Sequence, residues 1–251
     1  MSYFIRPAGE ETVLYLHGMG SSKLDFLSAA ECAELREKTL VALGFPGCGN
    51  TNYHDDVPLG TDDLADIVAQ FADAVGLRPF NLIGHSLGGL AGLLLAKKCP
   101  ERVKSFTNIE GNLMPEDCFI TRRVVQHSFA DLVRSSFLEK LRAEYAQSPY
   151  VGVRIYSDRF RKQVSERAAF DYSTSIVRYS DQSDLFSWFV NLSSPRLFVH
   201  GSANRSLSYI PRLRAENVPV LEIPNSHHWV LYDNPHFFYR AFAQFLHKDG
   251  R

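Results

Sequence analysis

The chain lacks the cysteine patterns that mark disulfide-rich and metal-binding proteins. Its 251 residues include four cysteines, Cys32, Cys48, Cys99 and Cys118, with no C-x-x-C pair among them. Their spacing matches neither a disulfide framework nor a metal site. We therefore expect reduced, structural thiols of the kind found in cytosolic proteins, with no bound metal.

Long apolar runs and an excess of one charge are also absent. The longest apolar stretch, 87–96, contains three glycines, and about 20 apolar residues are needed to span a bilayer. The opening sequence, MSYFIRPAGEE, has no apolar core typical of a secretory signal. Lys and Arg (27) nearly balance Asp and Glu (28), so nucleic acid or an anionic membrane is not favoured as a partner. We expect a cytoplasmic protein.

Short apolar runs alternate with amphipathic segments along the chain. Runs rich in β-branched and aromatic residues, bounded by Gly or Pro, predict strands. These runs lie at 12–16, 39–43, 80–83, 103–109, 196–199 and 218–223. Apolar residues at helical spacing predict helices after Thr61, over 87–98 and over 235–248. The alternation favours an α/β fold with a doubly wound, mostly parallel sheet.

Residues 111–194 interrupt this alternation. They include no convincing strand sequence, and a loop of about 80 residues without structure is improbable. We expect a helical cap inserted between two core strands, with a core formed by 1–110 and 195–251. The aromatic side chains of the cap could line an apolar acyl or aryl pocket, or simply pack the cap onto the core. They are Phe129, Phe137, Phe160, Phe170, Tyr172, Tyr179, Phe186, Trp188 and Phe189.

The strongest chemical signal is Gly-His-Ser-Leu-Gly at 84–88, between a predicted strand and a predicted helix. A G-x-S-x-G sequence in that setting forms a strained turn that exposes the serine hydroxyl above the sheet edge. The pentapeptide alone could be a chance Gly/Ser turn, but its context favours Ser86 as a nucleophile.

A second signal, His-Gly-Met-Gly-Ser-Ser at 17–22, follows the first strong strand. A nucleophilic serine requires backbone N–H donors for the oxyanion of its intermediate. The loop could supply the amide of Met19, and the residue after the serine could supply that of Leu87. By itself the loop could be an ordinary Gly-rich turn. We also expect His17 and His85 to line the site.

A third signal, Asn-Ser-His-His-Trp at 225–229, lies between the last strand and the terminal helix. Serine is a weak nucleophile unless a base takes its proton. Either His227 or His228 could be that base, and Trp229 would then lie beside the substrate.

Together these motifs resemble the α/β-hydrolase superfamily along almost the whole chain: HGMGSS, GFPGCGNT, GHSLGG, PERV and HHWVLYDNP. In that superfamily the catalytic histidine is commonly followed by an aromatic residue, which favours His228 over His227. The resemblance also implies a trimmed sheet of six or seven strands, with 2–6 as an edge strand. We expect the cap to lie over Ser86, with Trp188 near the pocket mouth.

The resemblance leaves the acid in an unusual place. The superfamily usually has an aspartate in a G-x-x-D turn after the cap, but here that turn ends in Asn204. Some haloalkane dehalogenases instead place a glutamate at the end of the strand after the elbow helix, which corresponds to Glu110. Glu110 could also be an exposed turn carboxylate, with the acid supplied from elsewhere. The alternatives are Asp181, Asp184 and Asp233.

The resemblance implies a serine hydrolase that cleaves a small carboxylic ester, thioester or lactone through an acyl-enzyme. Ser86 would be the nucleophile, His228 the base and Glu110 the acid, with no cofactor and a small acyl compound as the substrate. Carbon–carbon bond hydrolysis, acyl transfer and perhydrolysis by the same residues remain alternatives, as does a hydrolase-like ligand receptor. A serine at the elbow argues against dehalogenation and epoxide hydrolysis.

Overall fold

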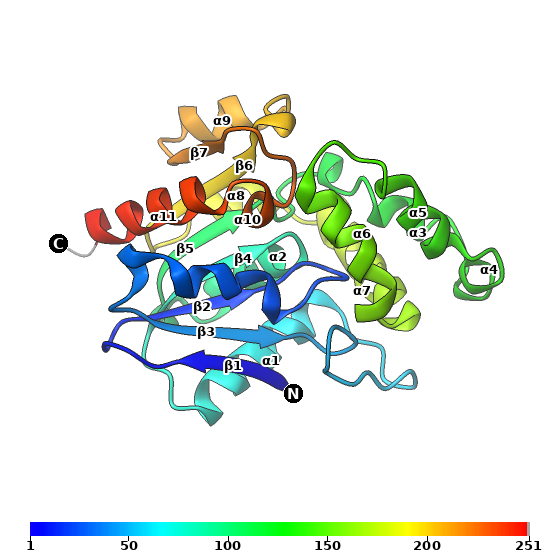
Figure 1. Cartoon of the computed structure of the whole chain (residues 1–251), viewed down its shortest axis with the longest axis horizontal. Coiled ribbons are helices and arrows are strands. Elements are labelled where there is room, and N and C mark those ends of the chain that lie inside the picture. The colour runs from blue at the N-terminus through cyan, green and yellow to red at the C-terminus, as the bar shows by residue number, and fades with distance from the viewer. Residues whose placement is uncertain (250–251) are drawn as a thin grey trace.

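The computed structural model describes residues 1–249, apart from the side chains of 161–163, 248 and 249. A seven-stranded sheet runs through its centre (Figure 1) in the order β1-β3-β2-β4-β5-β6-β7. The strands are β1 (Ser2–Arg6), β2 (Thr12–Leu16), β3 (Thr39–Gly44), β4 (Phe80–His85), β5 (Val103–Ile109), β6 (Arg196–Gly201) and β7 (Val220–Ile223). Only the edge strand β1 is antiparallel to its neighbour. The predicted doubly wound α/β fold is confirmed.

Helices cover both faces of the sheet because strand residues alternate between two apolar cores. Leu14 and Leu82 belong to the core under α1 (Thr61–Ala74), α2 (Leu87–Lys98), α8 (Leu185–Val190) and α9 (Ile210–Ala215). Val13 and Ile83 belong to the other core, under the 3-10 helix η1 (Lys23–Glu31), α10 (Val230–Asp233) and α11 (Pro235–Asp249). Among the described helices, none has the length and apolarity to cross a bilayer.

The segment between β5 and β6 is helical, as the sequence predicts, and most of it projects from one end of the sheet (Figure 1). Its projecting helices are α3 (Thr121–Val124), α4 (Phe129–Arg134), α5 (Phe137–Tyr145), α6 (Val151–Gln163) and α7 (Glu166–Gln182). The last helix, α8, instead returns to the core. There the Phe189 ring lies 5.9 Å from Phe106 and 6.3 Å from Phe198, which belong to β5 and β6.

The return of α8 makes one expectation wrong. Trp188 does not lie at a pocket mouth above Ser86, because Lys97 Nζ sits 3.4 Å from the centre of its ring. Lys97 is in the last turn of α2, whereas Ser86 precedes the first residue of that helix. A helix of 12 residues is about 18 Å long, so Trp188 packs at the opposite end of α2 from Ser86.

A buried histidine joins the ends of the neighbouring strands β2 and β3. His17 follows β2 and has no exposed surface. Its Nε2 accepts a hydrogen bond from the Phe45 amide at 2.9 Å, so Nδ1 carries the proton and donates to the Gly18 carbonyl at 2.7 Å. Burial lowers the pKa of His17 to about 4, so the ring is neutral at physiological pH and fixes the start of the 18–22 loop.

We expect His17 to make the protein less stable in mild acid. The unfolded chain binds a proton below a pKa of about 6.5, whereas the folded chain resists protonation until about 4. The stability contributed by this difference is present above pH 6.5 and decreases as the pH falls toward 4. At pH 5 the loss is about 2 kcal/mol. Urea unfolding at pH 7.5 and pH 5 measures it.

A matched pair of variants separates the contribution of His17 to the pH dependence of stability from that of the other histidines. In His17→Asn the free energy of unfolding should be lower at pH 7.5, and its decrease toward pH 5 should be about 2 kcal/mol smaller than in the wild type. The exposed His54 offers a control, and His54→Gln should keep the wild-type decrease. An unchanged decrease in His17→Asn would contradict this interpretation.

Candidate active site

Ser86 occupies a strained turn between β4 and α2. Its φ of 53° and ψ of −117° lie outside the regions that L-residues normally adopt. The flanking glycines allow the turn to pack closely. A Cβ on Gly84 would lie 2.3 Å from the Gly88 carbonyl oxygen, and one on Gly88 would lie 2.3 Å from the Leu16 carbonyl oxygen. The predicted elbow is therefore present, and it exposes the serine at the carboxyl edge of the sheet.

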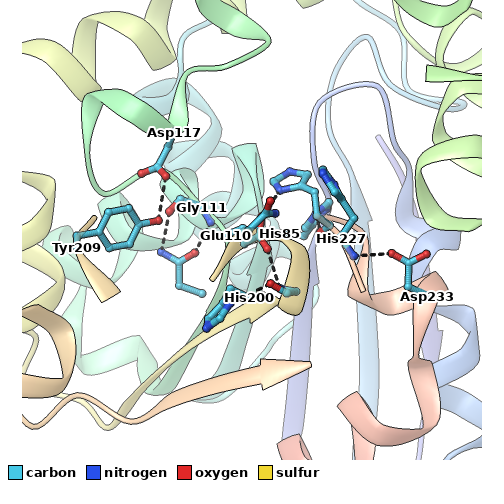
Figure 2. A network of polar contacts seen from close by, with 12 residues as sticks. His85, Glu110, Gly111, Asp117, His200, Tyr209, His227 and Asp233 are labelled. Atoms are coloured by element: carbon cyan, nitrogen blue, oxygen red, sulfur yellow. Dashed lines mark hydrogen bonds and ion pairs between the residues drawn. The ribbon is translucent and has the colours of Figure 1, made fainter. Parts of the chain in front are cut away.

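Glu110 lies at the end of β5, the strand next to β4, and also has a positive φ of 44°. The residue is 7% exposed, and its carboxylate receives three hydrogen bonds (Figure 2). Oε1 accepts from the Gly201 amide at 2.8 Å, and Oε2 accepts from Asn204 Nδ2 at 2.7 Å. His228 Nδ1 lies 2.7 Å from the same Oε2. The predicted hydrogen bond between Glu110 and His228 is present, and Asn204 supports the carboxylate instead of replacing it.

These donors decide the charge of Glu110. Burial is the largest influence and raises the pKa of the carboxyl group. Even so, the hydrogen bond and charge of His228 and the donors Gly201 and Asn204 together bring the pKa below its ordinary value. The ionised carboxylate can only accept, so His228 Nδ1 carries the proton. The other ring nitrogen, Nε2, is then the one that can accept a proton from a hydroxyl group.

One small cavity brings Ser86 and His228 together with the predicted oxyanion loop. Gly18 and Met19 line it from that loop, and His85 and Trp229 line it from beside the serine and the histidine. The segment inserted between β5 and β6 completes the wall. Its lining residues are Asn112, Asp117, Phe119, Ile120, Thr121, Tyr156 and Ile176. About 30 Å³ remains free inside.

The two amides expected to hold an oxyanion adjoin Ser86. A Cβ on Gly18 would lie 3.2 Å from Ser86 Cβ, so the loop that carries Met19 lies against the serine. Leu87 begins α2, where backbone N–H groups have no partner within the helix. Within the described chain, neither the Met19 nor the Leu87 amide donates a hydrogen bond to another residue. Both are available to a bound oxygen.

The two adjacent histidines have different surroundings. The His227 amide donates to Asp233 Oδ2 at 2.9 Å (Figure 2), and its ring packs 5.2 Å from that of Tyr150. His227 does not contribute to the cavity described above. Of the two rings, that of His228 is the one that reaches both Glu110 and the cavity.

The other carboxylates considered as the acid bind elsewhere. Asp181 pairs with Arg122 at 2.6 Å, and Asp184 accepts from the Ser187 amide at the start of α8. Asp233 accepts from the Gly152 amide at 2.7 Å and from the His227 amide. It therefore fixes the loop before His228 to the first turn of α6, without contacting the His228 ring.

The remaining expectations about the cavity wall are mixed. His85 and Trp229 line the cavity as predicted, but His17 does not, because its ring nitrogens hold the backbone behind the loop. In the described part of the chain, none of the nine cap aromatics listed from the sequence lines this cavity. Phe160, for example, packs over Gly20, where a Cβ would lie 2.1 Å from its ring.

Two aromatic residues of the wall were missed by the sequence analysis. The Phe119 ring stands edge-on to His228 at 5.5 Å, and the Tyr156 ring stacks on Trp229 at 4.3 Å. Phe119 follows Glu110 by nine residues, and this short distance from the acid was a usable signal. Nothing in the local sequence distinguishes Tyr156 from the other aromatics of the cap.

Comparisons with known proteins identify the family of the chain. The family model described as the alpha/beta hydrolase fold matches residues 11–237. A putative esterase/lipase of Mycoplasma pneumoniae is 22% identical over 241 residues, covering 93% of this chain and 88% of its own.

Two solved structures have the same fold. A carboxylesterase structure from Nitrososphaera gargenis gives a TM-score of 0.82 at 15% identity, covering 99% of this chain and 94% of its own. A thermophilic esterase from Thermogutta terrifontis gives 0.77 at 18% identity, covering 99% and 93%. These similarities support a hydrolase. Because the family model covers most of the chain, the protein belongs to the α/β-hydrolase fold family.

Proposed function

We propose that this protein is a serine hydrolase that cleaves a small carboxylic ester, thioester or lactone through an acyl-enzyme intermediate. The observation that carries the proposal is the buried Glu110–His228 hydrogen bond beside a cavity shared with Ser86. An ionised carboxylate on Nδ1 orients the imidazole and stabilises its charged form, which a serine nucleophile requires of its base. The esterase relatives support the same class of substrate.

In the first half of the reaction Ser86 Oγ attacks the substrate carbonyl carbon while its proton moves to His228 Nε2. The imidazolium is stabilised by the Glu110 carboxylate, and the amides of Met19 and Leu87 hold the oxyanion. Collapse of the intermediate breaks the bond to the leaving group, which takes the proton from His228 Nε2. The acyl group is then esterified to Ser86.

In the second half of the reaction water takes the place of the alcohol. His228 Nε2 removes a proton from water as its oxygen attacks the acyl carbonyl carbon. The second intermediate expels Ser86 Oγ, which recovers its proton from His228. The products are a carboxylic acid and the free enzyme. His85 does not compete as the base, because burial and the neighbouring His228 place its pKa well below the usual range.

We expect Ser86→Ala to remove covalent labelling by an organophosphonate and to lower kcat for a p-nitrophenyl acyl ester by at least about 1000-fold. The variant keeps Cβ, and so the packing of the elbow. Mass spectrometry of the labelled protein measures the first effect. Ser128→Ala, which changes an exposed helix-capping serine of the cap, is the control and should label fully. Wild-type turnover by Ser86→Ala would refute the serine mechanism.

We expect Glu110→Gln to lower kcat by at least about 100-fold, because an amide cannot stabilise the His228 imidazolium. In another triad the corresponding change costs about 10⁴. Asn204→Ala should cost less than about 10-fold, since it removes one of three donors to Glu110. Steady-state kinetics of the two variants decides between these residues. Near-wild-type turnover in Glu110→Gln, or a larger loss in Asn204→Ala, would show that the acid is misassigned.

A further inference from the structure

The cavity beside Ser86 is too small to enclose an ester as it stands. About 30 Å³ is free inside it, which is room for about two water molecules. Sites that enclose small organic molecules usually offer about 300 Å³ or more. A substrate must therefore extend out of the cavity or displace part of its wall.

The exposure of the lining residues shows where this can happen. Among the described residues of the lining, most are buried, and Ser86 and Asp117 are half-buried. Phe119 differs, because 46% of its surface is exposed although it lines the same cavity. A ring that contacts both the cavity and solvent is the part of the wall that separates the two. Phe119 therefore occupies the position at the mouth that was expected for Trp188.

The Phe119 ring lies over the reacting end of the cavity. It is edge-on to the His228 ring, with the two ring centres 5.5 Å apart. His228 lines the same cavity as Ser86 and is the base of the proposed reaction. A bulky group attached to the reacting centre between Ser86 and His228 would therefore meet the Phe119 ring.

The other aromatic rings of the wall are held in place by their neighbours. Tyr156 and Trp229 are 5% and 3% exposed, and their rings stack 4.3 Å apart. The Tyr156 ring also packs 5.1 Å from the ring of Phe160. The His228 ring is fixed by its hydrogen bond to Glu110. None of these rings can move away from the cavity without repacking the buried side chains around it.

No comparable restraint acts on the side chain of Phe119. Within the described chain, neither backbone group of Phe119 makes a hydrogen bond to another backbone group. The segment before it is fixed, because Asp117 Oδ2 accepts from the amides of Leu113 and Met114 at 2.8 Å and 2.9 Å. After it, α3 begins at Thr121. The exposed ring can therefore turn about its side-chain torsions toward solvent while the backbone on both sides stays in place.

We propose that Phe119 is a specificity residue that sets the size of the groups that reach Ser86. In the position seen here its ring leaves space for a small group, and larger groups enter only when the ring turns toward solvent. The steric cost rises with the size of the bound group, so the site prefers small groups on the reacting centre. This inference rests on the proposed function and adds to it the size of substrate that the site accepts.

Two phosphotriesters that differ only in size test the proposal. The compounds p-nitrophenyl dimethyl phosphate and p-nitrophenyl dibutyl phosphate each react once with a nucleophilic serine. Ser86 Oγ bonds to phosphorus, its proton passes to His228, and the bond to p-nitrophenolate breaks. Because both alkyl groups grow together, one of them meets Phe119 whichever side of the site holds the acyl group. We measure the second-order rate constant of p-nitrophenolate release and divide it by that for hydroxide alone.

The wild type should react with the dimethyl compound at least about tenfold faster than with the dibutyl compound. In Phe119→Ala the dibutyl-to-dimethyl ratio should rise by at least about tenfold, because the side chain that excludes the larger group is gone. In Phe119→Trp the ratio should fall by at least about threefold, because a larger ring closes the mouth further. A general change in the reactivity of Ser86 cancels in the ratio.

The chain offers a matched control in Phe237. Its side chain is 43% exposed near the start of α11, and it does not line the cavity. Phe237→Ala should therefore keep the wild-type ratio.

A wild-type ratio near one, or equal ratios in Phe119→Ala and the wild type, would overturn the proposal, as would an equal rise in Phe237→Ala. If Phe119→Ala does not fold, Phe119→Trp decides, and an unchanged ratio there refutes the proposal. The proposed function fails separately. It is overturned if the wild type releases no p-nitrophenolate from either compound, or if Ser86→Ala releases it as fast as the wild type.

Discussion

A carboxylate buried at the carboxyl end of strand β5 is the constraint on which the site depends. An unpaired buried charge would be costly, but Glu110 receives hydrogen bonds from Gly201, Asn204 and His228. Each donor belongs to a different segment: the end of β6, the turn after it, and the loop after β7. The hydrogen bonds to this one carboxylate therefore hold three separate segments of the chain together, and they orient the His228 ring.

The sheet register places the nucleophile beside this carboxylate. His85 pairs with Ile109 in the parallel ladder between β4 and β5, and the Ser86 amide donates to the Ile109 carbonyl at 3.0 Å. Ser86 and Glu110 are thus the next residues along two neighbouring strands, and both have positive φ. Two strained residues at one edge are consistent with a site whose geometry is held by the surrounding sheet.

Features that local sequence determines were predictable. The strands, the elbow at Ser86 and the position of Glu110 at a strand end follow from runs of a few residues and their order along the chain. The direction in which a side chain of a long insertion points does not follow from the local sequence. Trp188 lies on a helix that returns to the sheet, and Phe119 and Tyr156 reach the cavity, because these positions depend on how the insertion packs over the core.

The central claim is that Glu110, and not Asn204, holds the proton on His228 Nδ1. Proton NMR of the wild-type enzyme tests it most directly, because a proton shared between imidazole and a buried carboxylate resonates far downfield of ordinary amides. The account predicts such a signal in the wild type and in Asn204→Ala, and its loss from that region in Glu110→Gln. A downfield signal that survives in Glu110→Gln, or disappears only in Asn204→Ala, would contradict the account.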